Sequence, residues 1–182
     1  MSEKKPTTGM IYNIAILSFL DKPVDHIIQA FLQKYPDHIE NQEARVSLNF
    51  VSLFFETDRG VVRINLMQPI SPYLIDKLAR TYYHEKEGAI ILFSKNNDPS
   101  FKAAKTFYNR LIKENEEFPI PIAFVELEQD ESSQPHIDEP VILENTPHVA
   151  YYGINENADG FEYILRFIIQ KYHSALKRSE LL

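Results

Sequence analysis

The sequence predicts an α/β fold: a mostly parallel six-stranded sheet with one antiparallel strand and with helices on both faces. Two observations predict it. Short apolar runs alternate with longer segments whose apolar residues recur at helical spacing, which is the pattern of strands and helices in a parallel sheet. A hairpin signal in the first half adds an antiparallel pair. The predicted strands are residues 12–18, 46–56, 62–66, 89–93, 120–127 and 149–154.

The chain first predicts a strand, a turn and a helix. Residues 12–18 are a short apolar run that ends at Ser18, which is typical of a buried strand. Apolar residues then follow at helical spacing, and Pro36 closes the helix. This apolar stripe consists of Val24, Ile27, Ile28, Phe31, Leu32 and Tyr35.

The next two strands form the predicted hairpin, whose turn is Thr-Asp-Arg-Gly at residues 57–60. Apolar and polar residues alternate after this turn. In the strand before it, the apolar phase shifts between Phe50 and Val51. This shift indicates either a bulge or burial on both faces of the strand, and the sequence does not decide between the two.

The second half continues the alternation of helices and strands. Residues 72–84 predict a helix, residues 89–93 a central parallel strand, and residues 101–112 another amphipathic helix. After the last strand, residues 161–176 predict the terminal helix.

Residues 128–147 are acidic, contain prolines and show no helical stripe, so we expect an irregular loop there. We expect residues 1–10 to be a disordered tail, residues 11–177 to be a single domain, and residues 178–182 to be a short C-terminal tail.

Composition excludes several functions. The net charge of −7 opposes general binding to nucleic acid or to an anionic membrane, because both need a basic surface. The chain has no cysteine, so it offers no thiolate metal site or thiol nucleophile. No signal peptide, membrane span or lipid anchor is indicated. We therefore expect a cytoplasmic protein with no direct membrane anchor.

Histidines and acidic residues do not form a convincing catalytic or metal site. The six histidines are scattered without metal-ligand spacing, so no metal and no cofactor is expected. His136 and Asp138 with Ser132 or Ser133 could be drawn as a hydrolase triad, yet they crowd one loop and lack a nucleophile elbow. The acidic run is best explained as a solvated loop.

The turn after the first strand is the first place to seek function, because ligands of parallel sheets bind beyond the carboxyl ends of the strands. Residues 18–25 read Ser-Phe-Leu-Asp-Lys-Pro-Val-Asp and contain no glycine. Pro23 removes a backbone N–H, and Asp25 is expected to be the N-cap of the following helix. Asp21 and Asp25 would also repel a polyphosphate. The turn therefore has the position of a phosphate-binding loop without its chemistry.

The segment ARTYYHEKEGAIILFSKNNDPSF, residues 79–101, resembles the middle of small GTPases of the Ras and Rab type. The paired tyrosines, the glycine before the apolar strand and the serine-phenylalanine that opens the next helix carry this resemblance. The preceding hairpin and the terminal GINENADGFEYILRFII are similar as well, so the likeness spans roughly residues 11–176. It implies a small-GTPase-like fold in which the helix after the fifth strand is lost or reduced.

The resemblance also shows that the nucleotide-binding positions are degenerate. In the phosphate loop pattern the two glycines, the lysine and the hydroxyl are replaced by Ser18, Pro23, Val24 and Asp25. The stretch that senses the terminal phosphate becomes Gln68, Pro69, Ile70, Ser71 and Pro72. The guanine-reading motif is replaced by Glu126, Leu127, Glu128 and Gln129, and its SAK-like companion by Tyr151, Tyr152 and Gly153.

We therefore expect a pseudo-GTPase, not an enzyme, that serves as a nucleotide-independent protein-interaction or scaffold module, with GTP and GDP disfavoured as ligands. The alternative is an atypical nucleotide binder that uses Lys22 for a phosphate and Asp130 for a base. The resemblance implies that partners contact the first hairpin and the switch-like segments through Phe54, Phe55, Tyr73 and Tyr83.

The terminal helix offers two further candidate partner contacts. Tyr163 and Phe167 lie four residues apart, off the main apolar stripe, and so share a second face of the helix. Aromatic residues there indicate either a partner surface or packing under a neighbouring loop.

Overall fold

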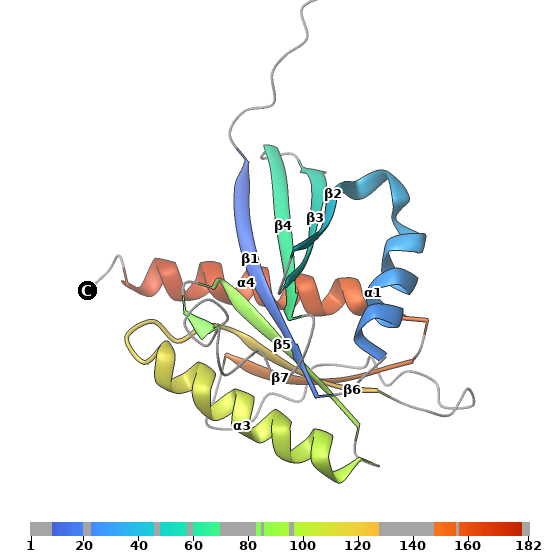
Figure 1. Ribbon diagram of the computed structural model, residues 1–182. Coiled ribbons are helices and arrows are strands. Elements are labelled where there is room, and N and C mark those ends of the chain that lie inside the picture. Colours follow the sequence, from blue (N-terminus) through green and yellow to red (C-terminus); the bar gives the residue numbers. More distant parts are fainter. Residues whose placement is uncertain are drawn as a thin grey trace, which may run out of the picture.

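The computed structural model describes residues 9–19, 23–45, 48–57, 60–69, 83–84, 86–94, 97–127, 148–155 and 157–179. Its strands are β1 (Met10–Ser18), β2 (Ile39–Arg45), β3 (Leu48–Thr57), β4 (Gly60–Pro69), β5 (Gly88–Phe93), β6 (Ile122–Leu127) and β7 (Val149–Ile154). Its helices are α1 (Pro23–Lys34), the short 3-10 helix η1 (Pro36–His38), α3 (Asp98–Glu114) and α4 (Phe161–Ser179). These elements confirm the predicted α/β class (Figure 1).

The strands form one seven-stranded sheet in the order β2-β3-β4-β1-β5-β6-β7. Strand β1 pairs in parallel with β4 and β5, and β6 joins β5 to β7 in parallel. Strand β3 is antiparallel to both of its neighbours, so it is the one strand that runs against the others. The sheet is therefore mostly parallel with one antiparallel strand, as predicted.

The prediction of six strands is wrong because it omits β2 at the edge of the sheet. This strand, Ile-Glu-Asn-Gln-Glu-Ala-Arg, has no apolar alternation, and main-chain pairing with β3 holds it in place. The register shifts between Ile39 and Asn41, which marks a bulge in β2. Strand β3 has no such shift against β4, and Val51, Ser52 and Leu53 are all buried, so the phase shift in its sequence reflects burial on both faces.

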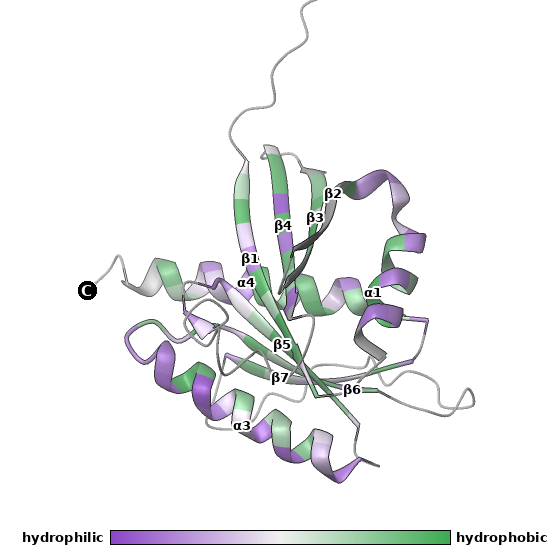
Figure 2. Ribbon diagram, viewed as in Figure 1, coloured by the Kyte–Doolittle hydropathy of each residue, from purple (hydrophilic) through white to green (hydrophobic). Residues whose placement is uncertain are grey.

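Helices cover both faces of the sheet, as predicted. Helices α1 and α4 pack on one face, where Ile14 and Ile16 of β1 meet Phe31 and Phe161. Helix α3 packs on the other face, where Ala15 and Leu17 of β1 meet Leu111. The central strands are apolar along most of their length, whereas the helices alternate between apolar and polar positions (Figure 2).

Three side chains form a polar chain across β3, β4 and β1. The Ser52 hydroxyl donates to Asn65 Oδ1 at 2.7 Å, and Asn65 Nδ2 donates to Asn13 Oδ1 at 2.9 Å. Ser52 and Asn65 are buried, at 5% and 9% exposure, so these bonds satisfy groups that water does not reach. These two hydrogen bonds therefore fix the position of the hairpin relative to β1.

Some predicted features lie outside the described residues. They are the predicted helix at 72–84 apart from Tyr83 and His84, the acidic loop at 128–147 with the helix expected to be lost there, and most of the two tails.

Candidate functional site

The carboxyl ends of the parallel strands form one edge of the sheet, and the helices that follow β1, β5 and β7 begin there. Strand β1 ends at Ser18, β5 at Phe93, β6 at Leu127 and β7 at Ile154. In parallel sheets ligands bind at this edge, because the connecting turns converge there. Four of the degenerate positions lie at this edge. Ser18 is the last residue of β1, Glu126 and Leu127 are the last two residues of β6, and Asp25 lies in the first turn of α1.

Two described residues flank the first turn, Ser18 at the end of β1 and Pro23 at the start of α1. Ser18 is 8% exposed, so its side chain is packed inside and not presented to a ligand. Helix α1 begins at Pro23, which suits the first helical position because its ring fixes φ and its missing N–H needs no partner there. The same ring removes one donor that an anion could have used.

Asp25 lies in the first turn of α1 and is exposed. The prediction that it is the N-cap is wrong, because the helix begins earlier, at Pro23. A carboxylate in the first turn is stabilised by the positive end of the helix dipole. It therefore adds a negative charge to the first turn of α1, the end of a helix where a bound anion would also be stabilised.

Between β5 and α3, the described residues Ser94, Asn97 and Ser100 hydrogen-bond to one another. Asn97 caps α3, since its side chain accepts from the Ser100 N–H at 2.9 Å. The Ser94 N–H donates to Ser100 Oγ at 3.2 Å, and the Asn97 N–H donates to the Ser94 carbonyl at 3.2 Å. Ser94 and Ser100 are 2% and 1% exposed. The polar groups of these three residues are therefore used to hold the start of α3 to the end of β5.

The end of β6 carries the carboxylate of Glu126, one of the predicted degenerate positions. The Tyr151 hydroxyl of β7 donates to Glu126 Oε2, and the neighbouring Leu127 is buried. The two strands pair so that Phe124 lies opposite Tyr151. The Tyr151, Tyr152 and Gly153 segment that was aligned with a nucleotide-binding loop lies inside β7. The following positions, Glu128 to Asp130, lie outside the described residues.

The turn between β7 and α4 holds an ion pair that the sequence pattern does not reveal. Asp159 pairs with Lys34 of α1, and its Oδ2 accepts from Asn155 Nδ2 at 2.8 Å. The hydrogen bond from Lys34 lowers the pKa of Asp159, and the Asn155 bond and the Lys34 charge add to the effect. Lys34 thus joins the end of α1 to the turn before α4.

The first predicted partner contacts lie on β3 of the hairpin. Phe54 and Phe55 are half-buried, and the His38 ring of η1 stacks on Phe55 with centroids 4.7 Å apart. His38 Nδ1 lies 2.9 Å from the Phe54 carbonyl. Sequence reasoning missed His38, because its contact depends on η1 folding back toward β3. The Phe54 and Phe55 side chains are therefore partly exposed to solvent, and the His38 ring packs beside them.

Two predicted partner contacts are wrong because their side chains are buried. Tyr83 is 0% exposed and packs in the core between the sheet and α3. Phe167 is 7% exposed, and its ring packs against Tyr152 of β7 with centroids 5.9 Å apart. Tyr163, at 49% exposure, remains available on the surface of α4. Gln68 is half-buried in β4, whereas Ser71, Pro72 and Tyr73 lie outside the described residues.

Within the described ranges, no three histidine, aspartate or glutamate side chains gather closely enough to hold a metal ion. Among the helices in those ranges, none combines the length and apolar character needed to cross a bilayer.

A comparison with models of known protein families finds no match to this chain, and a comparison with curated proteins finds no significant match either.

Proposed function

We propose that this chain is a pseudo-GTPase: a small-GTPase-like domain that binds no nucleotide tightly and acts as a protein-interaction module. The observation that carries the proposal is the start of α1, where Pro23 and Asp25 follow the carboxyl end of β1. A phosphate loop needs converging N–H donors, close backbone approach and a cation at this place. At the described start of α1, the chain offers a proline and a carboxylate.

Magnitudes support this conclusion. Charge-assisted hydrogen bonds contribute about 1.5–3 kcal/mol each, so the loss of three or four of them weakens binding by roughly 5–12 kcal/mol. That loss corresponds to about four to nine orders of magnitude in affinity. Replacement of the lysine position by Val24 and of the hydroxyl position by Asp25 removes favourable charge and adds repulsion. A nucleotide-dependent switch is not expected from such a site.

The interaction role rests on surfaces that do not depend on nucleotide. The hairpin strand β3 carries the half-buried Phe54 and Phe55 beside His38, with Phe55 also packed against the core, and α4 presents the exposed Tyr163. Because β2 pairs with the outer side of β3, a partner would meet side chains of the hairpin or the free edge of β2, not the edge of β3.

Two measurements test the proposal: the nucleotide content of the purified protein, and the set of partner proteins that it binds. The purified chain is denatured, and the supernatant is chromatographed for guanine nucleotides; we expect none in stoichiometric amount. The tagged chain in a lysate of its own cells is then incubated either with EDTA or with magnesium and a non-hydrolysable GTP analogue, and the proteins that are afterwards crosslinked to it are compared. We expect the same set in both cases. Co-purified GDP or GTP, or a set that changes with nucleotide, would overturn the proposal.

A further inference from the structure

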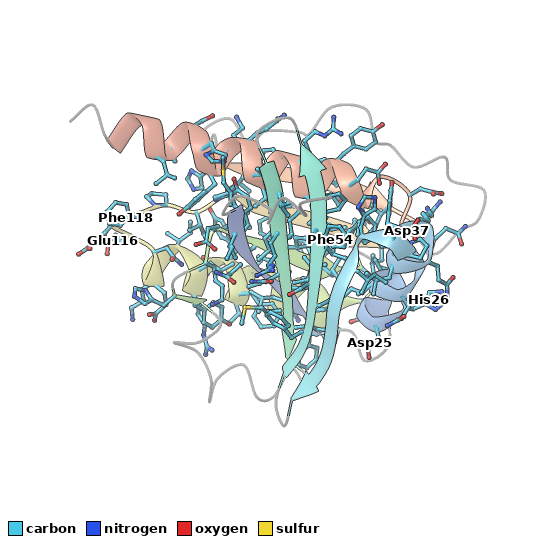
Figure 3. The ribbon with its side chains drawn as sticks, turned by 90° about the horizontal axis from the view of Figure 1, so that it is seen from above. Asp25, His26, Asp37, Phe54, Glu116 and Phe118 are labelled. Atoms are coloured by element: carbon cyan, nitrogen blue, oxygen red, sulfur yellow. The ribbon has the colours of Figure 1, made fainter. Side chains whose placement is uncertain are left out.

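A groove lies at the amino ends of β5 and β6, which is the end of the parallel strands opposite the candidate site. It encloses about 780 Å³. Its walls are the turn before β5, the segment between α3 and β6, and the last turns of α4. Glu116 and Phe118, which belong to this groove, lie at the opposite end of the molecule from Asp25 and Asp37 (Figure 3).

Hydrogen bonds fix two walls of the groove to each other. Asn115 Nδ2 donates to the Tyr83 carbonyl at 2.6 Å and to the Leu111 carbonyl at 2.9 Å. His84 Nδ1 lies 3.3 Å from the Glu114 carbonyl. The turn before β5 is thus tied to the C-terminus of α3. A groove with tied walls binds at a lower cost in conformational entropy than one that must first be ordered.

Exposed apolar side chains form one side of the groove. Phe118 is 69% exposed and Leu176 is 39% exposed, and Tyr172, Pro119 and Ala175 lie beside them. The Tyr172 ring packs edge-on against Tyr12 of β1 with centroids 6.3 Å apart, which anchors this side to the sheet. Exposed apolar residues that gather at a groove mark a binding surface more often than scattered ones do.

The charge around the groove is negative. Four glutamates line it, Glu87, Glu114, Glu116 and Glu117, against two lysines, Lys86 and Lys113. Within the part of the chain that the structure describes, Glu116 and Glu117 form no ion pair. Helix α3 also ends here, so the negative end of its dipole adds to the field. Both effects favour a basic ligand.

We propose that this groove binds a basic peptide segment of a partner protein. The segment inserts one apolar side chain beside Phe118 and Leu176 and places lysine or arginine side chains against Glu116 and Glu117. This surface lies away from the carboxyl edge of the sheet, so its use depends neither on nucleotide nor on the hairpin surface. The chain would then hold a partner at the end of the sheet that has no part in nucleotide chemistry.

The test selects random peptides displayed on phage against the full chain and measures the enriched peptides by calorimetry. We expect the enriched sequences to combine lysine or arginine with one large apolar residue. Phe118→Ala and the pair Glu116→Lys with Glu117→Lys should each weaken binding by about tenfold or more. Matched controls are Phe101→Ala at the other end of α3 and Asp37→Lys in η1, which should leave binding unchanged. Thermal unfolding checks that each variant is folded.

Nuclear magnetic resonance gives a second measurement. Amide shifts caused by the peptide should fall in residues 84–87, 113–120 and 172–176. Peptides without basic residues, or equal affinity for the Glu116→Lys and Glu117→Lys variant, would overturn the proposal. So would self-association of the chain that the same variant abolishes, because a second copy would then be the occupant. Binding that appears only after removal of residues 1–8 would likewise assign the groove to the chain's own N-terminal segment.

Discussion

Gly88 of β5 lies directly against Ile168 of α4, so closely that a Cβ on residue 88 would overlap Ile168 Cγ2. Ile168 is 0% exposed and Gly88 is buried, so neither group can move into solvent. The absence of a side chain at position 88 therefore sets how near α4 approaches the middle of the sheet.

The variant Gly88→Ala should lower the free energy of unfolding by about 1–3 kcal/mol, because the added methyl group overpacks this contact. Urea denaturation measures the change. In an Ile168→Ala background the same substitution should cost less, since Cγ2 is gone, and the double-mutant cycle should show coupling. Strictly additive changes in the free energy of unfolding would contradict a direct steric contact between residues 88 and 168.

The polar chain from Ser52 through Asn65 to Asn13 should contribute to stability. Asn65→Ala leaves a buried hydroxyl and a carbonyl oxygen without a partner, so we expect a loss of about 1–3 kcal/mol in the free energy of unfolding. Chemical denaturation checks it. Asn109→Ala on the exposed side of α3 is the matched control, with an expected change within about 0.5 kcal/mol. Equal effects for both variants would contradict the assignment.

Strands with strong apolar runs could be predicted from sequence, and those without could not. Strand β7 has the predicted bounds, because Val149–Ile154 is apolar and buried along nearly its whole length. Strand β2 was missed, because main-chain bonds to β3 hold it and leave no mark on its side-chain pattern. The shift at Phe50 and Val51 could not be resolved either, because Ser52 is polar yet buried against a partner on β4.

The place of the candidate site followed from topology, but its contacts did not. Ser18, Asp25 and Glu126 lie at the carboxyl edge because parallel strands all end there. The contact of Glu126 with Tyr151 joins residues that are distant in sequence. Burial of Tyr83 and Phe167 depends on how closely α3 and α4 approach the sheet, which helical spacing alone does not give.

The Asp159 carboxylate should titrate below its ordinary range. Its pKa is lowered first by the hydrogen bond from Lys34 and then by that from Asn155, so its contribution to stability is present above the unfolded pKa of 3.8 and is lost as the pH falls through the folded value. The pKa of Asp159 is measured from the pH dependence of its Cγ chemical shift in carbon-detected nuclear magnetic resonance. Lys34→Ala should raise the pKa; an unchanged titration would show that the ion pair has no such effect in solution.

Tyr152 should lose its proton only at strongly alkaline pH. Burial raises its pKa from 10.0 to about 12, so the folded chain retains this proton while the unfolded chain releases it. The resulting stabilisation is complete below the unfolded pKa and disappears as the pH rises through about 12. The difference between the ultraviolet titrations of the wild type and Tyr152→Phe should show a late phenolate step. A step near pH 10 would contradict burial of this hydroxyl.

The central claim is that the edge bearing Pro23 and Asp25 does not accept a polyphosphate. Isothermal titration calorimetry of the nucleotide-free chain with magnesium and GDP, and then with a non-hydrolysable GTP analogue, tests it most directly. We predict no dissociation constant below about 1 mM for either nucleotide. A submicromolar dissociation constant would contradict the claim and would make the chain a nucleotide-binding protein.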